Sequence, residues 1–162
     1  MPDPMLNSAG QLVAYPFTAF NFGIEIKVEG VAMQVCDAAF SECDGLEMTM
    51  DVKTIREGGN NGKQIRLTGP INYGQVTMKR GMTANFDLWD WFNLMVANAS
   101  LRADAEVVVF AADGTTERAR FLLSRCVPVK LKSPPLNAKE GAVAIEELQL
   151  SYESLSLKKP AA

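Results

Sequence analysis

Apolar and polar residues alternate with a period of two along much of this chain, and no other feature limits its possible folds as strongly. The pattern is clearest in residues 22–28, where Phe22, Ile24 and Ile26 alternate with small or charged residues. Successive side chains on a strand point to opposite faces of a sheet. The segment is therefore predicted to be a strand with one buried face and one wet face.

The same period predicts further strands. Gly30 interrupts the first alternation and residues 31–35 resume it, which indicates a bent strand or a tight hairpin around residues 29–30. The segment 143–157 changes phase twice, so it is predicted to contain bulges or to change the surface that it covers. The other predicted strands are residues 40–52, with Asp44-Gly45 as a bulge or turn, residues 76–82, and residues 106–110 and 118–129 joined by a turn at Asp113-Gly114.

One segment has a helical period instead. Asn85 is a suitable N-cap, and Asp87 and Asp90 place negative charge in the first turn, where it favours the helix dipole. The helix is predicted to pack on a sheet, with Leu88, Trp89, Trp91 and Phe92 as its packing residues. The apolar stripe consists of Leu88, Trp91, Phe92, Met95 and Ala99, widened by Trp89 and Val96.

These elements amount to seven or more strands and one helix, without alternation of strands and helices. The predicted fold is mostly β, an antiparallel β-barrel or a two-sheet sandwich with one flanking α-helix. A length of 162 residues fits a single domain, residues 1–162. Residues 1–16 contain three prolines and little periodicity, so they are expected to form an extended N-terminal arm.

The chain contains no histidine, which excludes catalytic triads with histidine, imidazole metal sites and histidine pH switches. Its three cysteines, Cys36, Cys43 and Cys126, fit neither a CxxC pair nor a zinc ribbon and are expected to be buried in a reducing compartment. No metal, cofactor or catalytic residue is expected. Neither a signal peptide nor a membrane span is expected from the sequence, and its net charge of −3 gives no global attraction to nucleic acid.

Residues 56–62 form a polar, glycine-rich segment, Arg-Glu-Gly-Gly-Asn-Asn-Gly. It is not a phosphate-binding loop, because Glu57 and Gln64 stand where the Walker pattern needs glycine and Ser or Thr. A long polar loop in a compact domain is usually functional or ordered by a partner. We expect this loop to be mobile in the isolated subunit and to order against a neighbouring molecule.

Arg80 shares the phase of Val76 and Met78, so its side chain is expected to be buried or half-buried. A buried arginine needs a carboxylate partner. That partner lies either in the same chain or in another subunit, and the sequence leaves both alternatives open. Glu146 and Glu147 are neighbours on a predicted strand, so they point to opposite faces and are expected to be solvated or interface charges.

Several short motifs, taken in order, resemble those of one family. The resemblance extends from residue 20 to residue 157, and no single motif decides it. It is carried by Phe40-Ser41-Glu42 with Gly45-Leu46-Glu47, Arg56-Glu57-Gly58-Gly59-Asn60, Leu67 with Gly69, Lys79-Arg80-Gly81, Leu88-Trp89-Asp90-Trp91, Pro128-Val129-Lys130, Leu136-Asn137-Ala138, and Ile145-Glu146-Glu147-Leu148 leading to Glu153. The chain resembles the tail-tube proteins of contractile phages and phage-tail-like injection particles, which are related in fold to the haemolysin-coregulated protein of type VI secretion.

The resemblance implies a structural subunit without enzymatic activity. Its hexameric rings would stack into a hollow tube inside a contractile sheath, with a baseplate or tube initiator and a tail terminator at the ends. The lumen would deliver phage DNA or effector proteins. Such a subunit is made in the bacterial cytoplasm and becomes part of a particle that is released or docked at a membrane.

Contacts between subunits or rings are expected at the glycine-rich loop and at the basic pair of residues 79–80. The residues are Arg56, Glu57, Gly58, Gly59, Asn60, Asn61, Lys79 and Arg80. Three other functions remain open: a tube-initiator paralogue at the baseplate, a monomeric small-ligand-binding β-barrel, and an enzyme of unfamiliar type. A ligand-binding barrel needs no partner, whereas a tube subunit is expected to form rings or tubes; an initiator has the same fold and forms one ring per particle.

Overall fold

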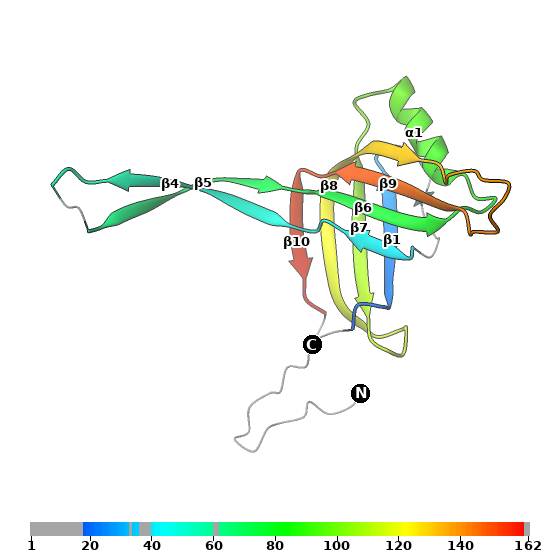
Figure 1. Cartoon of the computed structure of the whole chain (residues 1–162), viewed down its shortest axis with the longest axis horizontal. Helices are drawn as coiled ribbons and strands as arrows, with labels where there is room; N and C mark the ends of the chain where they lie inside the picture. Colours follow the sequence, from blue (N-terminus) through cyan, green and yellow to red (C-terminus); the bar gives the residue numbers. More distant parts are fainter. Residues whose placement is uncertain (1–17, 33, 36–39, 60–61, 161–162) are drawn as a thin grey trace, which may run out of the picture.

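The computed structural model describes residues 18–32, 34–35, 40–59 and 62–160. The expected arm of residues 1–16 lies outside this set, as do Cys36, Asn60 and Asn61. Ten strands and one helix occupy the described residues (Figure 1). They are β1 (Phe22–Val28), β2 (Gln34–Val35), β3 (Glu42–Asp44), β4 (Met48–Arg56), β5 (Gln64–Tyr73), β6 (Gln75–Gly81), α1 (Asp87–Ala97), β7 (Ala103–Phe110), β8 (Glu117–Lys132), β9 (Ile145–Ser151) and β10 (Ser154–Lys158).

Eight of these strands form one antiparallel network in the order β2-β1-β7-β8-β9-β6-β3, with β10 also paired to β8. The long strand β8 belongs to two layers: its first part pairs with β7 and β10, and residues 127–132 pair with β9. Arg125, just before this change of partner, has a positive φ of 52°. No pairing among the described strands closes a barrel, so the structure is a sandwich of two connected layers rather than a closed barrel.

The core lies between the two layers and is built by the alternating strands. Ile24, Ile26 and Val28 of β1 are buried, as the alternation predicts. The other layer contributes Val76 and Met78 from β6, and Leu148 and Leu150 from β9. Fully burying each such side chain contributes about 1.5–3 kcal/mol.

The helix begins one residue later than predicted. Phe86 is the N-cap, while the side chain of Asn85 accepts a hydrogen bond from the amide of Asp87 at 3.2 Å. Leu88 and Trp91 are buried, and Trp89 and Phe92 are half-buried. The expected stripe is too long at its C-terminal end, since Val96 is 78% exposed and Ala99 lies beyond the last helical turn.

Two predicted strands are each divided in the structure. Residues 40–52 break at Gly45, which has a φ of +103° and separates β3 from β4. Residues 143–157 form β9 and β10, which have different neighbours, so the phase changes mark a change in the surface that is covered. The turns at residues 29–30 and 113–114 are present.

β5 is a strand that the sequence analysis does not predict. Gly69 and Pro70 interrupt its alternation, and both residue types are unfavourable inside a strand. β5 pairs only with β4, as a separate two-stranded sheet. It forms because hydrogen bonds to a neighbouring strand stabilise it even though its side chains are mostly exposed.

Candidate functional site

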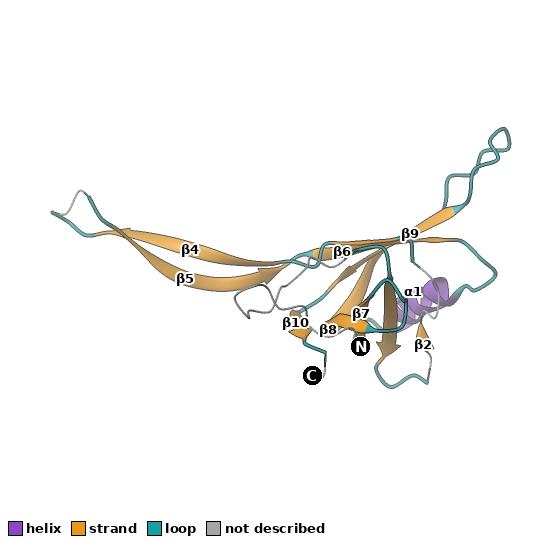
Figure 2. Ribbon diagram, turned by 90° about the horizontal axis from the view of Figure 1, so that it is seen from below, coloured by secondary structure: helices purple, strands orange, loops and turns teal. Residues whose placement is uncertain are grey.

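The hairpin of β4 and β5 projects away from the two layers as a separate arm (Figures 1 and 2). We refer to residues 48–73 as the arm. Every residue of β4 is exposed, and β5 is exposed at all but two positions. The loop expected at residues 56–62 is therefore only the tip of a much longer element.

The arm exposes an unusual number of large apolar side chains. Seven of them are between 36% and 59% exposed. They are Met48, Met50, Val52, Ile55, Ile65, Leu67 and Ile71. Exposed apolar residues that gather on one element, rather than occurring singly, mark an interaction surface.

The register of the hairpin divides these residues between its two faces. Met48 pairs with Tyr73 and Met50 with Ile71 near the root of the arm, whereas Ile55 pairs with Ile65 near its tip. Because Met50 and Ile55 are an odd number of residues apart along β4, the two apolar groups lie on opposite faces of the ribbon. A register shift between Met50 and Val52 adds one residue to β5. Beyond the shift Val52 pairs with Thr68 and keeps the face of Met50, so the apolar side chains change face between Val52 and Ile55.

Tyr152 fixes the root of the arm. Its hydroxyl accepts a hydrogen bond from the amide of Glu47 at 3.1 Å. The same hydroxyl lies 2.9 Å from the carbonyl oxygen of Gly45 and 3.0 Å from that of Glu47, so its single proton is shared between these two acceptors. Its ring packs against that of Tyr73, with the ring centroids 5.8 Å apart. One buried side chain thus contacts both ends of the arm.

Two glycines at the root allow the chain to pass close to its neighbours. A Cβ at Gly45 would lie 2.0 Å from the carbonyl oxygen of Gln75, in addition to the strain of a φ of +103°. A Cβ at Gly74 would lie 2.5 Å from the side chain of Glu47. The direction of the arm is therefore set by tight packing, which makes it a preformed projection.

The residues predicted to contact other subunits fall into two separate places. Arg56, Glu57, Gly58 and Gly59 lie exposed at the tip of the arm, where a Cβ at Gly58 would meet nothing within 4 Å. Asn60 and Asn61 lie outside the described residues. Lys79 and Arg80 lie on β6, in the body of the molecule.

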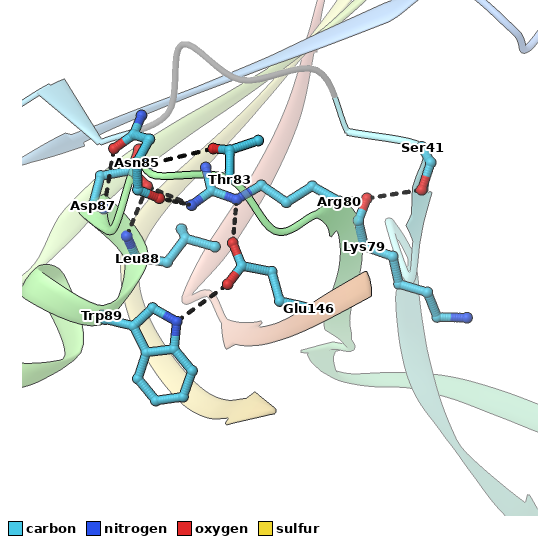
Figure 3. Close-up of polar contacts among 9 residues, drawn as sticks. All are labelled: Ser41, Lys79, Arg80, Thr83, Asn85, Asp87, Leu88, Trp89 and Glu146. Atoms are coloured by element: carbon cyan, nitrogen blue, oxygen red, sulfur yellow. Dashed lines mark hydrogen bonds and ion pairs between the residues drawn. The ribbon is translucent and has the colours of Figure 1, made fainter. Parts of the chain in front are cut away.

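Arg80 is buried among partners from its own chain (Figure 3). Its Nε donates to Glu146 on β9 at 2.5 Å, and its Nη2 donates to Asp87 at the start of α1, also at 2.5 Å. The side chain is 1% exposed. The sequence left open whether the carboxylate partner of Arg80 lies in the same chain or in another subunit. In the structure both partners are in the same chain, and Arg80 presents no surface to another subunit.

The two acidic partners join the helix to the sheet. Glu146 also accepts a hydrogen bond from Nε1 of Trp89 at 3.1 Å, and Asp87 accepts one from the amide of Leu88 at 2.8 Å. Glu146 is 1% exposed, so its predicted role as a solvated or interface charge is wrong. The two glutamates do point to opposite faces, since Glu146 is buried and Glu147 is half-buried. What the sequence did not show is that Arg80 lies directly opposite Glu146 in the register of β6 and β9.

Lys79 points to the other face of β6 and forms a surface ion pair with Glu42 at 2.9 Å. The hydrogen bond to Glu42 raises the pKa of the Lys79 ammonium. Exposed pairs of this kind contribute little to stability. Of the basic pair, Lys79 is the member that remains accessible to a partner.

An apolar hollow of about 350 Å³ opens between the layers. Its walls include Phe22, Leu46 and Phe121, and no charged side chain lines it. Small-molecule sites usually add a few polar groups that fix the ligand. The hollow therefore gives little support to the ligand-binding alternative.

Cys43 lies in the wall of this hollow, and Cys126 is buried in the core. Burial, reinforced by Asp44, raises the pKa of the Cys43 thiol to about 11, and burial raises that of Cys126 to about 12. The described residues bring together no group of three acidic or cysteine side chains that could hold a metal ion. In the same part of the chain, no helix is long and apolar enough to cross a membrane.

The sequence pattern of the T4-like virus tail tube protein gp19 matches residues 18–156. The chain belongs to this tail tube family. It is therefore a structural subunit of a tail tube or of the baseplate to which such a tube is attached, and the family is not known for enzymatic activity. Comparison with curated protein sequences gives no match.

Several solved chains share this fold. A chain in the anti-feeding prophage baseplate has a TM-score of 0.80 at 23% identity, over 91% of this chain and 98% of that one. A chain in the anti-feeding prophage cap has a TM-score of 0.77 at 20% identity, over 96% and 100%. A chain in the sheath-tube complex of the extracellular contractile injection system PVC has a TM-score of 0.75 at 21% identity, over 91% and 95%.

Sequence reasoning missed most of what defines the arm in this tail tube protein. It placed contacts at the tip but did not predict β5 or the root formed by Tyr73 and Tyr152. The available signals were Gly45 and Gly74, which flank a segment with apolar residues at Ile65, Leu67 and Ile71. A glycine in or beside a strand often marks a bulge, a tight bend or a close approach of another part of the backbone.

Proposed function

We propose that this protein is the repeating subunit of the inner tube of a contractile tail or phage-tail-like injection particle. Six copies form a ring, and rings stack into a tube with a central lumen. The observation that carries the proposal is the arm: a preformed, apolar, solvent-exposed hairpin is suited to bridge neighbouring copies. A contact between two different surfaces, repeated around an axis, generates a ring when the rotation closes.

The partners of the tube follow from this role. Further copies of the chain lie above and below each ring, a sheath surrounds the tube, and a baseplate and a terminator close its ends. Solved relatives come from a sheath-tube complex, a baseplate and a cap, which supports these partners. The lumen carries the cargo, either DNA or effector proteins, when sheath contraction drives the tube through an envelope.

A second candidate is a tube initiator that forms one ring on the baseplate. It is favoured by the likeness to a chain in a baseplate structure, which has a TM-score of 0.80. An initiator and a main tube subunit share the fold and differ in whether further rings of the same subunit are added. The initiator forms a ring but does not add further rings of its own kind.

The purified full-length chain tests both candidates by native mass spectrometry together with negative-stain electron microscopy. A main tube subunit gives hexamers, six-fold rings with a central hole, and stacks of such rings. An initiator gives rings that do not stack at any concentration. Monomers that persist at high concentration would contradict both candidates and favour a ligand-binding protein.

A further inference from the structure

The apolar side chains of the arm change face half-way along it. Near the root they occupy the face that carries Met48, Met50 and Ile71, and near the tip they occupy the other face, which carries Ile55, Ile65 and Leu67. At each end of the arm, the face opposite the apolar group carries polar side chains. They are Thr49, Asp51 and Asn72 near the root, and Thr54, Arg56, Gln64 and Arg66 near the tip. Asn72 donates a hydrogen bond to Asp51 at 2.9 Å.

The ribbon itself turns over along its length. In Figure 1, β4 and β5 cross and exchange places between root and tip. Two-stranded ribbons twist more strongly than strands in larger sheets. Because of this twist, one face of the ribbon points in opposite directions at the root and at the tip. The apolar side chains also move from one face to the other, so the two reversals cancel. The two apolar groups then lie on the same side of the arm in space.

We propose that the arm is a one-sided clamp: a continuous apolar side lies flat on one second copy of this chain, and the polar side faces away. The stripe has the length of β4, nine residues or about 30 Å at 3.3 Å per residue. This inference rests on the proposed function and adds to it that root and tip of one arm grip the same neighbour.

Charge indicates that the occupant is a copy of the same chain. Residues 48–73 contain four basic and two acidic residues, a net charge of +2, within a chain of net charge −3. Removing the arm's +2 leaves −5 on the rest of the chain. Lys53 pairs with Leu67 on the apolar side near the tip, so a positive charge accompanies the apolar surface. A basic arm on an acidic body is complementary to the body of a second copy.

The test places a photoreactive benzophenone amino acid at one arm position at a time in the full-length chain. Positions 50 and 65 lie on the apolar side, and positions 49 and 54 are their matched controls on the polar side. Irradiated samples are separated on a denaturing gel, and mass spectrometry identifies the cross-linked peptides. We expect positions 50 and 65 to give cross-linked dimers through the body of one neighbouring copy, several-fold more than positions 49 and 54.

The inference would be overturned by equal cross-linking from both sides of the arm, or by cross-links from positions 50 and 65 to two different copies. Rings that form without cross-links from positions 50 and 65 would also overturn it and leave the proposed function intact. Cross-linked dimers without rings would contradict the proposed function and leave the clamp intact.

A second measurement needs no substitution. Hydroxyl-radical footprinting of the wild-type chain compares assembled and dissociated samples. Met48, Met50, Ile65 and Leu67 are expected to be protected together on assembly. Protection of the root pair or of the tip pair alone would contradict a single occupant along the whole stripe.

Discussion

The hydroxyl of Tyr152 accepts a hydrogen bond from the amide of Glu47 at 3.1 Å, so a residue that follows β9 holds the chain where the arm begins. Tyr152 is 4% exposed, and Glu47 directly precedes the first strand of the arm. The contact couples the core of the sandwich to the element that we propose as the clamp. The stability of the body and the direction of the arm therefore depend on the same side chain.

Replacing Tyr152 by phenylalanine tests this coupling. The variant keeps the ring packing on Tyr73 and removes the hydroxyl, which leaves the Glu47 amide without that acceptor. We expect the free energy of unfolding in urea to fall by about 1–3 kcal/mol. Hydrogen exchange of backbone amides at the arm's root is expected to be faster than in wild type. Unchanged exchange there would show that the hydroxyl does not hold the arm.

Gly45→Ala is expected to be severely destabilising. The new Cβ would lie 2.0 Å from the carbonyl oxygen of Gln75, on backbone with a φ of +103°. Gly58→Ala is the matched control, because its Cβ would meet nothing within 4 Å. Thermal melting is expected to show a large loss of stability for Gly45→Ala. For Gly58→Ala the stability is expected to change by no more than about 0.5 kcal/mol. Equal melting of the two variants would contradict the close approach at Gly45.

Arg80→Ala leaves Glu146 and Asp87 buried without their shared cation. Removing one partner of a buried ion pair costs about 3–5 kcal/mol. The control is Lys79→Ala, whose pair with Glu42 is exposed, and no measurable change in melting temperature is expected for it. If Arg80→Ala instead kept its stability and failed only in assembly, the arginine would belong to an interface after all.

Deleting residues 58–62 shortens the tip of the arm and leaves the two layers untouched. The deleted subunit is expected to fold, with the circular dichroism spectrum of the wild type, and to fail to extend tubes in negative stain. Loss of the fold itself would mean that the tip is structural. Tubes of normal length would remove the tip from the stacking contact.

Thiol reactivity checks the half-buried Cys43 and the buried Cys126. A Cys36→Ser variant leaves only Cys43 and Cys126 to react. A Cys43 pKa of about 11, against a reference of 9.0, lowers the thiolate fraction at neutral pH about 100-fold. The folded variant is therefore expected to react slowly with a disulfide reagent at pH 8, and the urea-unfolded variant quickly. Rapid reaction of the folded variant would place a thiol at the surface.

The body of the fold was predictable because its strands bury one face. Ile24 and Ile26 of β1 and Met78 of β6 are buried and alternate with more exposed residues. Because one face of each strand is buried, the alternation in the sequence predicts both the strand and its buried face. The ion pair of Arg80 was predictable in kind, since an arginine in an apolar phase needs a carboxylate. Its partner was not, because pairing Arg80 with Glu146 requires the register of two strands 66 positions apart.

The arm was harder to predict from the sequence, for a physical reason. Its strands bury neither face in the subunit, so their pattern reflects whatever covers them after assembly. Ile65 and Leu67 share one phase, and Gly69-Pro70 then breaks it. A segment whose partner is outside the chain gives an incomplete signal within one sequence.

The most direct test of the central claim is a helical reconstruction, by electron cryomicroscopy, of tubes assembled from the purified chain. The account predicts stacked six-fold rings in which each arm lies against the body of one neighbouring copy. Met50 and Ile65 would face that copy, and Thr49 and Thr54 would face away. Tubes in which the arms project into solvent, or in which rings are joined without them, would contradict the account.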